Sequence, residues 1–68
     1  MIIKITLHAR DKMSALAISA EMIRTAIQRG SRFGAGQRKF KAVYSFFTVV
    51  YVHAARDVYK IVTVYENK

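Results

Sequence analysis

A single apolar run in the second half of the chain restricts the fold more than any other feature. Residues 46–52 read Phe-Phe-Thr-Val-Val-Tyr-Val, and aromatic and β-branched side chains favour strands. Because side chains alternate between the two faces of a strand, this run is apolar on both faces. It predicts a central strand. The far side of that strand would have to be covered by the rest of the chain, by a second copy or by a partner.

Strand-like patterns recur along the chain, at residues 2–7, 38–44, 47–53 and 58–66. The segments between them differ in how well their residues suit a turn. Residues 54–57 suit a turn, and residues 31–36 are expected to form a loop or a frayed strand. Residues 45–46, Ser-Phe, make a poor hairpin turn by composition, so this segment is either a hairpin or part of one longer bent strand.

Two helices are expected after the first strand. Residues 8–16 have helical propensity and predict a short first helix. Ser19 has a side chain that suits an N-cap, and the carboxylate of Glu21 would interact favourably with the positive end of the helix dipole. The apolar residues that follow recur at helical spacing: Met22, Ile23, Ala26 and Ile27. They predict an amphipathic helix over about residues 19–29, which Gly30 would end as a left-handed cap.

The order of these elements predicts an α+β fold, β-α-α-β-β-β, with two N-terminal helices packed on an antiparallel sheet. A chain of 68 residues forms one domain, residues 1–68, and buries only about 60% of the surface that its unfolded form exposes. The core is therefore thin, and a homodimer is one way to extend it.

The charge of the chain indicates a polyanionic partner. Twelve Lys and Arg residues against four Asp and Glu residues give a net charge of +8, and nucleic acid is the usual partner of so basic a small domain. The alternative is a basic domain whose charge only prevents aggregation. Cysteine is absent, which fits a cytoplasmic location and excludes thiolate metal sites. No apolar run suits a membrane span, and the start does not resemble a signal peptide.

His8 is the first candidate for chemistry, because imidazole exchanges protons near neutral pH. RNA cleavage needs a base for the 2′-hydroxyl, an acid for the leaving oxygen and cations for the developing charge. Proton transfer could involve His8, Tyr44 or Tyr65, and the cations could be Arg10, Lys12, Arg38 and Lys41. The alternative is that His8 only hydrogen-bonds the backbone near a helix N-terminus.

The densest basic and aromatic stretch is Arg38-Lys39-Phe40-Lys41, followed by Tyr44. On a strand, Lys39 and Lys41 share one face, while Arg38, Phe40 and Tyr44 share the other. Lysine contacts to phosphate and aromatic stacking on bases are ordinary means of holding single-stranded RNA. Equally, the aromatic residues could belong to the core and the lysines to a solvated edge.

Other constellations are weaker. His53 is expected to be a polar residue at a strand end, and the four acids are too scattered for paired-carboxylate hydrolysis. Gly34-Ala35-Gly36 lacks the sequence of a phosphate loop and suits a simple turn. Neither a metal nor a cofactor is expected.

Several short motifs, taken in order, resemble a widespread family of small bacterial and archaeal domains of unknown function related to the RelE/ParE toxins. The matching positions are His8-Ala9, Lys12-Met13, Ile18-Ser19, the helix that ends at Gly30, Ala42-Val43-Tyr44, Val49-Val50-Tyr51 and Ile61-Val62-Thr63-Val64-Tyr65. They cover nearly the whole chain. Ala17 departs from the family, which prefers Gly there. Ser45-Phe46 departs from the usual Gly-Asp type of turn, so a longer or less tight hairpin is expected.

The resemblance implies the Barnase–EndoU–colicin–RelE fold, in which helices are followed by a curved antiparallel sheet that carries the active site. It implies a metal-independent endoribonuclease of the toxin–antitoxin type, or a relative that has lost catalysis. The catalytic residues would be His8, Lys41 and Tyr65, and the RNA-binding residues would be Arg10, Lys12, Arg38, Lys39, Tyr44 and Thr63.

Two other functions remain open. One is a non-catalytic RNA-binding module that uses the same basic face. The other is an interaction protein whose residues 46–52 pair with a second copy or with an antitoxin peptide. An antitoxin or another acidic protein is a partner that the positive charge would suit, whereas the few acidic residues argue against an antitoxin role for this chain itself.

Overall fold

The computed structural model describes residues 1–68 and contains two helices and five strands. In chain order they are β1 (Ile2–Ile5), α1 (Leu7–Leu16), α2 (Ala20–Arg29), β2 (Ser31–Gly34), β3 (Lys39–Tyr44), β4 (Phe47–Ala55) and β5 (Val58–Glu66). The strands form one sheet in the order β1-β5-β4-β3-β2. The α+β class and the central position of the apolar strand, now β4, are confirmed. Neither helix is long and apolar enough to cross a membrane.

The sheet differs from the expected one at both of its edges. Residues 31–34, expected as a loop or a frayed strand, form the edge strand β2, which pairs antiparallel with β3. All four residues of β2 are exposed, so no alternation of apolar and polar residues marks it in the sequence. At the other edge β1 pairs with β5 in parallel, and every other pair of strands is antiparallel.

Both helices begin at side chains that cap them. The Oγ1 of Thr6 accepts a hydrogen bond from the backbone N of Ala9 at 3.1 Å and donates to the carbonyl O of Ile61 at 2.9 Å, so the cap of α1 is also tied to β5. Ser19 caps α2 as predicted, with its Oγ accepting from the backbone N of Met22 at 3.2 Å. Between the helices, Ala17 adopts a left-handed conformation with φ of 57°.

The prediction that Gly30 ends α2 as a left-handed cap is wrong. Gly30 has φ of −72° and ψ of 168°, which is an extended backbone. The need for glycine comes instead from a close approach: a Cβ at this position would lie 2.5 Å from the carbonyl O of Ala26 and 2.7 Å from that of Val43. Gly30 therefore lets the end of α2 contact β3.

The expectation of a longer hairpin at residues 45–46 is also wrong. Tyr44 pairs with Phe47, so the loop between β3 and β4 has two residues, and Ser45 takes a positive φ of 53°. Asn67 binds this loop from beyond the end of β5. Its Nδ2 donates to the carbonyl O atoms of Ser45 and Phe47, both at 3.3 Å, and its Oδ1 accepts from the hydroxyl of Thr48. The tail of the chain thus stabilises a turn that its own residues do not favour.

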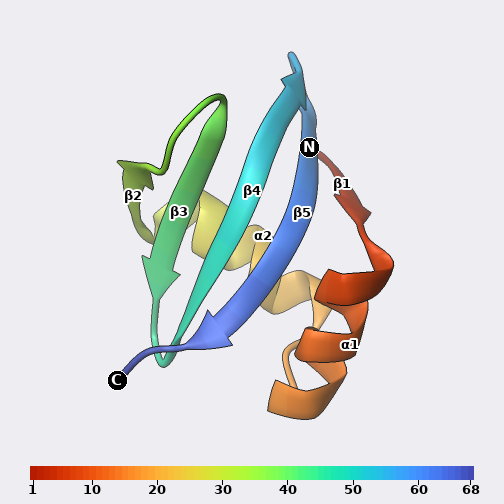
Figure 1. The fold of residues 1–68 in the computed structure, drawn as a ribbon, viewed down its shortest axis with the longest axis vertical. Coiled ribbons are helices and arrows are strands. Elements are labelled where there is room, and N and C mark those ends of the chain that lie inside the picture. Colours follow the sequence, from red (N-terminus) through yellow and green to blue (C-terminus); the bar gives the residue numbers. More distant parts are fainter.

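The core lies between the helices and one face of the sheet. In Figure 1, α2 crosses behind the sheet and α1 lies beside β5. The largest fully buried side chains of α2 and the strands pack between these layers: Ile23, Ile27, Phe47, Val49, Ile61 and Val64. The face of the sheet turned away from α2, called here the open face, carries no helix (Figure 1).

Because β4 is hydrogen-bonded to β3 on one side and to β5 on the other, it has no free edge. No further strand can therefore pair with the edges of β4, and contact of residues 46–52 with another chain stays a prediction. The open face also exposes less apolar surface than expected, because Val50 and Val52 are half-buried and Thr48 is 2% exposed. A homodimer stays a prediction.

Candidate nucleic-acid interface

Strand register arranges the side chains of the open face in three rows that cross the sheet. Side chains of β4 alternate between the faces, and Val49 and Tyr51 belong to the core, so Thr48, Val50 and Val52 point to the open face. Their register partners on β3 and β5, with Lys4 on β1, extend these rows. The first row is Lys4, Lys60, Val52 and Lys39, the second is Thr63, Val50 and Lys41, and the third is Tyr65, Thr48 and Val43.

These rows concentrate positive charge and contain no acid. Lys4, Lys39, Lys41 and Lys60 are all exposed. Neighbouring strands lie about 4.8 Å apart, so Lys39 and Lys60 start about 10 Å from each other, on opposite sides of Val52. Lys4 and Lys60 are direct register partners. Like charges at such positions lower stability, so this pair does not stabilise the sheet.

His8 continues the second row beyond the edge of β5. Its Nε2 lies 3.0 Å from the Oγ1 of Thr63, because the cap at Thr6 holds the first turn of α1 against β5. The Oγ1 of Thr63 also lies 3.4 Å from the carbonyl O of Val64. When the hydroxyl donates to that carbonyl, Nε2 must carry the proton and Nδ1 becomes the basic atom of the ring.

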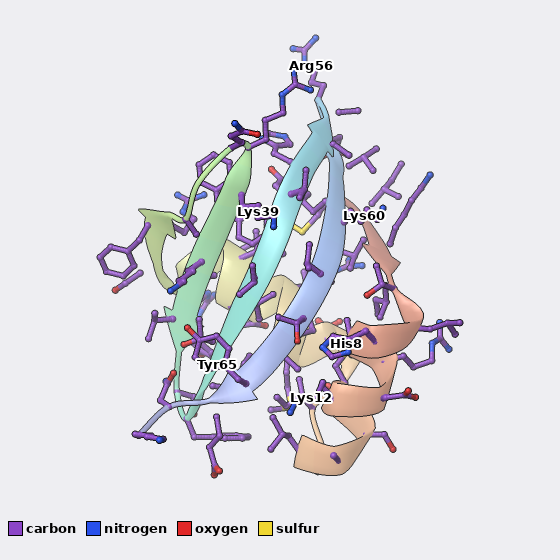
Figure 2. The ribbon with its side chains drawn as sticks, in the orientation of Figure 1. His8, Lys12, Lys39, Arg56, Lys60 and Tyr65 are labelled. Carbon is purple, nitrogen blue, oxygen red and sulfur yellow. The ribbon has the colours of Figure 1, made fainter.

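Two further predicted residues lie near this contact. Lys12 follows His8 by four positions and therefore shares its side of α1. Tyr65, which is 38% exposed, follows Thr63 by two positions on the same face of β5. Figure 2 shows His8 and Lys12 beside β5, Tyr65 near its end, and Lys39 over the sheet. Arg10 lies two positions from His8, so it does not share that side of the helix.

The remaining predicted residues lie elsewhere. Tyr44 is on the helix-covered face, where its ring packs edge-on against Phe47 with the centroids 6.2 Å apart, so the RNA-binding role given to it has no support in its position. Phe40 is on that face too, stacked on Tyr51 at 5.7 Å. Arg38 precedes β3 in a turn, with a positive φ of 57°, and does not share a strand face with them.

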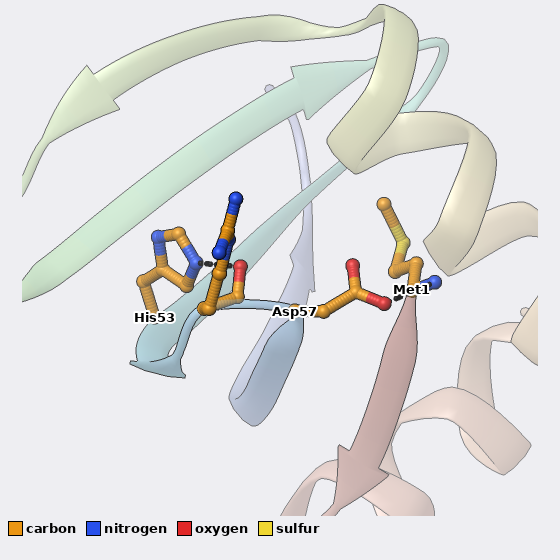
Figure 3. A network of polar contacts seen from close by, with 4 residues as sticks. Met1, His53 and Asp57 are labelled. Carbon is orange, nitrogen blue, oxygen red and sulfur yellow. Dashed lines mark hydrogen bonds and ion pairs between the residues drawn. The ribbon is translucent and has the colours of Figure 1, made fainter.

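His53 is the polar strand-end residue that the sequence predicts. Its Nε2 lies 3.1 Å from the carbonyl O of Arg56, and its ring stacks on Tyr59 with the centroids 4.5 Å apart. Figure 3 shows this contact beside the ion pair at the same hairpin, in which the N-terminal amine of Met1 lies 2.9 Å from Asp57. His53 is in β4 on the helix-covered face and takes no part in the rows.

Sequence reasoning missed Lys4 as a site residue, and alternation alone does not place Lys60 beside the predicted Thr63. Strict alternation would place Lys60 and Thr63 on opposite faces, because three positions separate them. A register shift makes Tyr51 pair with Ile61 while Val50 pairs with Thr63, so Val62 is an extra residue, as in a β-bulge. The bulge brings Lys60 and Thr63 to the same face.

Comparison of the chain with models of protein families, with curated proteins and with solved structures gives no match. The resemblance to small domains related to the RelE/ParE toxins therefore remains an expectation from the order of the motifs.

Proposed function

We propose that this protein binds single-stranded RNA on its open face and cleaves it without a metal ion, with His8 as a proton-transfer group. The observation that carries the proposal is the set of three registered rows, in which four lysines and no acid lie beside the contact between His8 and Thr63. A lysine-rich face without carboxylates suits a phosphate backbone, and its flatness suits an extended strand better than a compact ligand.

Cleavage would proceed by attack of the 2′-oxygen on the neighbouring phosphorus. A base removes the 2′-proton, the 5′-oxygen leaves with a proton from an acid, and the products carry a 2′,3′-cyclic phosphate and a 5′-hydroxyl. His8 would exchange one of these protons, and Tyr65, in the next row from Thr63, would line the other side of the phosphate. Lys12 would stabilise the developing charge.

Lys41 has a different role in this proposal from the catalytic one expected. Two strand spacings, about 10 Å, separate its backbone from that of Thr63. At that separation it would hold a neighbouring phosphate of the same strand. The lysines of the first row would hold the strand in the same way.

The test of binding is the salt dependence of affinity for an unstructured RNA oligonucleotide. Each single-strand phosphate contact contributes a slope of about 0.7, so replacing both Lys39 and Lys41 by Ala should lower the slope by about 1.4. Replacing Arg24 and Arg29 by Ala removes the same amount of charge from α2, which lies on the opposite side of the sheet. This change should lower the slope only slightly. Equal effects of the two pairs would mean that only net charge matters.

The test of cleavage uses the same RNA in EDTA, with product ends identified by mass spectrometry. Products with 2′,3′-cyclic phosphate that disappear with His8→Ala would support the ribonuclease. Salt-dependent binding without any cleavage would favour the non-catalytic RNA-binding module.

A further inference from the structure

A second candidate site lies on the helix-covered face of the sheet, near the hairpin between β4 and β5. It is a hollow of about 310 Å³, within the lower range of small-molecule sites, about 300–1,000 Å³. Its lining residues are Arg32, Phe33, Gly34, Phe40, Tyr51, His53 and Tyr59. None of the residues assigned to RNA on the open face lines it.

Four rings of the lining form a continuous aromatic series, in which each ring contacts the next. Phe40 stacks on Tyr51 with the centroids 5.7 Å apart, Tyr51 meets Tyr59 edge-on at 5.7 Å, and Tyr59 stacks on His53 at 4.5 Å. Tyr51 is 3% exposed and fixes the position of its neighbours, whereas Phe40 is 36% exposed. An exposed ring next to a rigid aromatic series offers a stacking surface to a planar molecule.

Gly34 leaves room beside this surface. It is the register partner of Phe40, and a Cβ at Gly34 would meet no atom within 4 Å. Its φ is not in the left-handed region, so neither crowding nor backbone strain requires glycine here. The missing side chain keeps the surface next to Phe40 accessible.

The charge of the lining residues favours a ligand that carries a negative charge. Arg32 is the only lining residue with a permanent charge, and no Asp or Glu lines the hollow. A guanidinium donates paired hydrogen bonds to a phosphate or a carboxylate. We infer that the hollow binds a planar aromatic molecule that carries one anionic group, with its ring against Phe40 and the anion at Arg32. This site is separate from the RNA-binding face and does not depend on the proposed function.

The two natural sources of such chemistry are a mononucleotide and a small aromatic carboxylate. The experiment titrates the full chain, labelled with ¹⁵N, with AMP and with 4-hydroxyphenylacetate, and follows the amide of Gly34 and the guanidinium of Arg32 by NMR. Adenosine has the ring without the charge, and ribose 5-phosphate has the charge without the ring. Saturable shifts are expected with one or both charged aromatic molecules. Adenosine should bind at least about tenfold more weakly because it lacks the anion for Arg32, and ribose 5-phosphate should also bind more weakly because it lacks the ring that would stack on Phe40.

Three variants locate the site. Arg32→Gln should weaken binding about tenfold or more by removing the charge-assisted bonds, and Gly34→Leu should abolish it by filling the hollow. Arg29→Gln, at a residue that does not line the hollow, should leave the binding unchanged. Saturation by AMP alone, or by the carboxylate alone, would identify the source. The inference is overturned if neither saturates the shifts at millimolar concentration, or if binding survives Gly34→Leu.

Discussion

The Nε2 of His8 lies 3.0 Å from the Oγ1 of Thr63 and connects the first turn of α1 to β5 across 55 positions of sequence. The sequence predicts a role for His8 because imidazole exchanges protons near neutral pH, and a role for Thr63 follows from the motif in the last strand that resembles the RelE/ParE-related domains. Their contact places a titratable ring at the edge of a lysine-rich face, where a bound phosphate backbone would pass. It is Nε2, rather than Nδ1, that faces the hydroxyl of Thr63.

The contact predicts different effects for its two partners. In the RNA-cleavage assay, His8→Ala should lower the rate by a factor of about 10²–10⁴, the usual loss for an acid–base group. Thr63→Val keeps the shape of the side chain and should cost less, because it removes only the hydrogen bond to the ring. His53→Ala is the matched control, since His53 is also exposed but lies on the other face. Cleavage by His8→Ala at the wild-type rate would remove His8 from the mechanism.

Ala17 predicts a stabilising substitution. Its left-handed φ of 57° costs an L-residue about 1–2 kcal/mol, and glycine avoids this cost while adding about 0.4–1 kcal/mol of entropy to the unfolded chain. Ala17→Gly should therefore raise the free energy of unfolding by about 0.5–1 kcal/mol in urea titration. Ala15→Gly, inside α1, should lower it by about 1 kcal/mol. A loss of stability in both variants would contradict the strain assigned to Ala17.

Asn67 predicts an unusual effect for a residue next to the end of the chain. Asn67→Ala leaves the buried hydroxyl of Thr48 without its partner and removes two bonds to the β3–β4 loop. Loss of such partners costs about 1–3 kcal/mol, measured as a lower free energy of unfolding. Lys68→Ala, with no such contacts, should change little. Adding Thr48→Val to Asn67→Ala should recover part of the loss, because the unpaired hydroxyl is then gone.

The elements that were correctly predicted are those whose sequence patterns are local. The helical spacing after Ser19 and the Ser19 cap define α2, and the apolar run defines β4 as the central strand. Lys39 and Lys41 were placed on one face and Phe40 on the other by alternation alone. Alternation divides a strand into two faces but does not say which of them the helices cover.

What was missed depends on contacts between distant segments. The strand β2 has no buried residue and exists through its pairing with β3. Gly30 is needed because α2 approaches β3, which no pattern around Gly30 reveals. The side shared by Lys60 and Thr63 depends on the bulge at Val62, and bulges arise from pairing register rather than from the sequence of one strand. The candidate RNA-binding face was therefore only partly predictable.

Tyr51 predicts how stability changes at alkaline pH. Burial raises the pKa of Tyr51 above its ordinary value of 10.0, against the opposing effect of the nearby Arg32 guanidinium. The folded protein thus keeps the phenolic proton to a higher pH than the unfolded chain. This contribution to stability is fully present below pH 10.0, the unfolded value, and is lost as the pH rises through the folded pKa, with a slope of at most about 1.4 kcal/mol per pH unit.

Urea titrations between about pH 8 and pH 11 should therefore show the wild type losing stability faster than Tyr51→Phe above pH 10.0, since other groups titrate alike in both proteins. The difference between their phenolate absorbance curves isolates Tyr51, and its midpoint should lie above that value. Arg32→Gln should move the midpoint higher still, because the guanidinium favours the phenolate, whereas Arg29→Gln should not. A midpoint at or below 10.0 would mean that water reaches the Tyr51 hydroxyl and that the aromatic series around it is looser than its packing indicates.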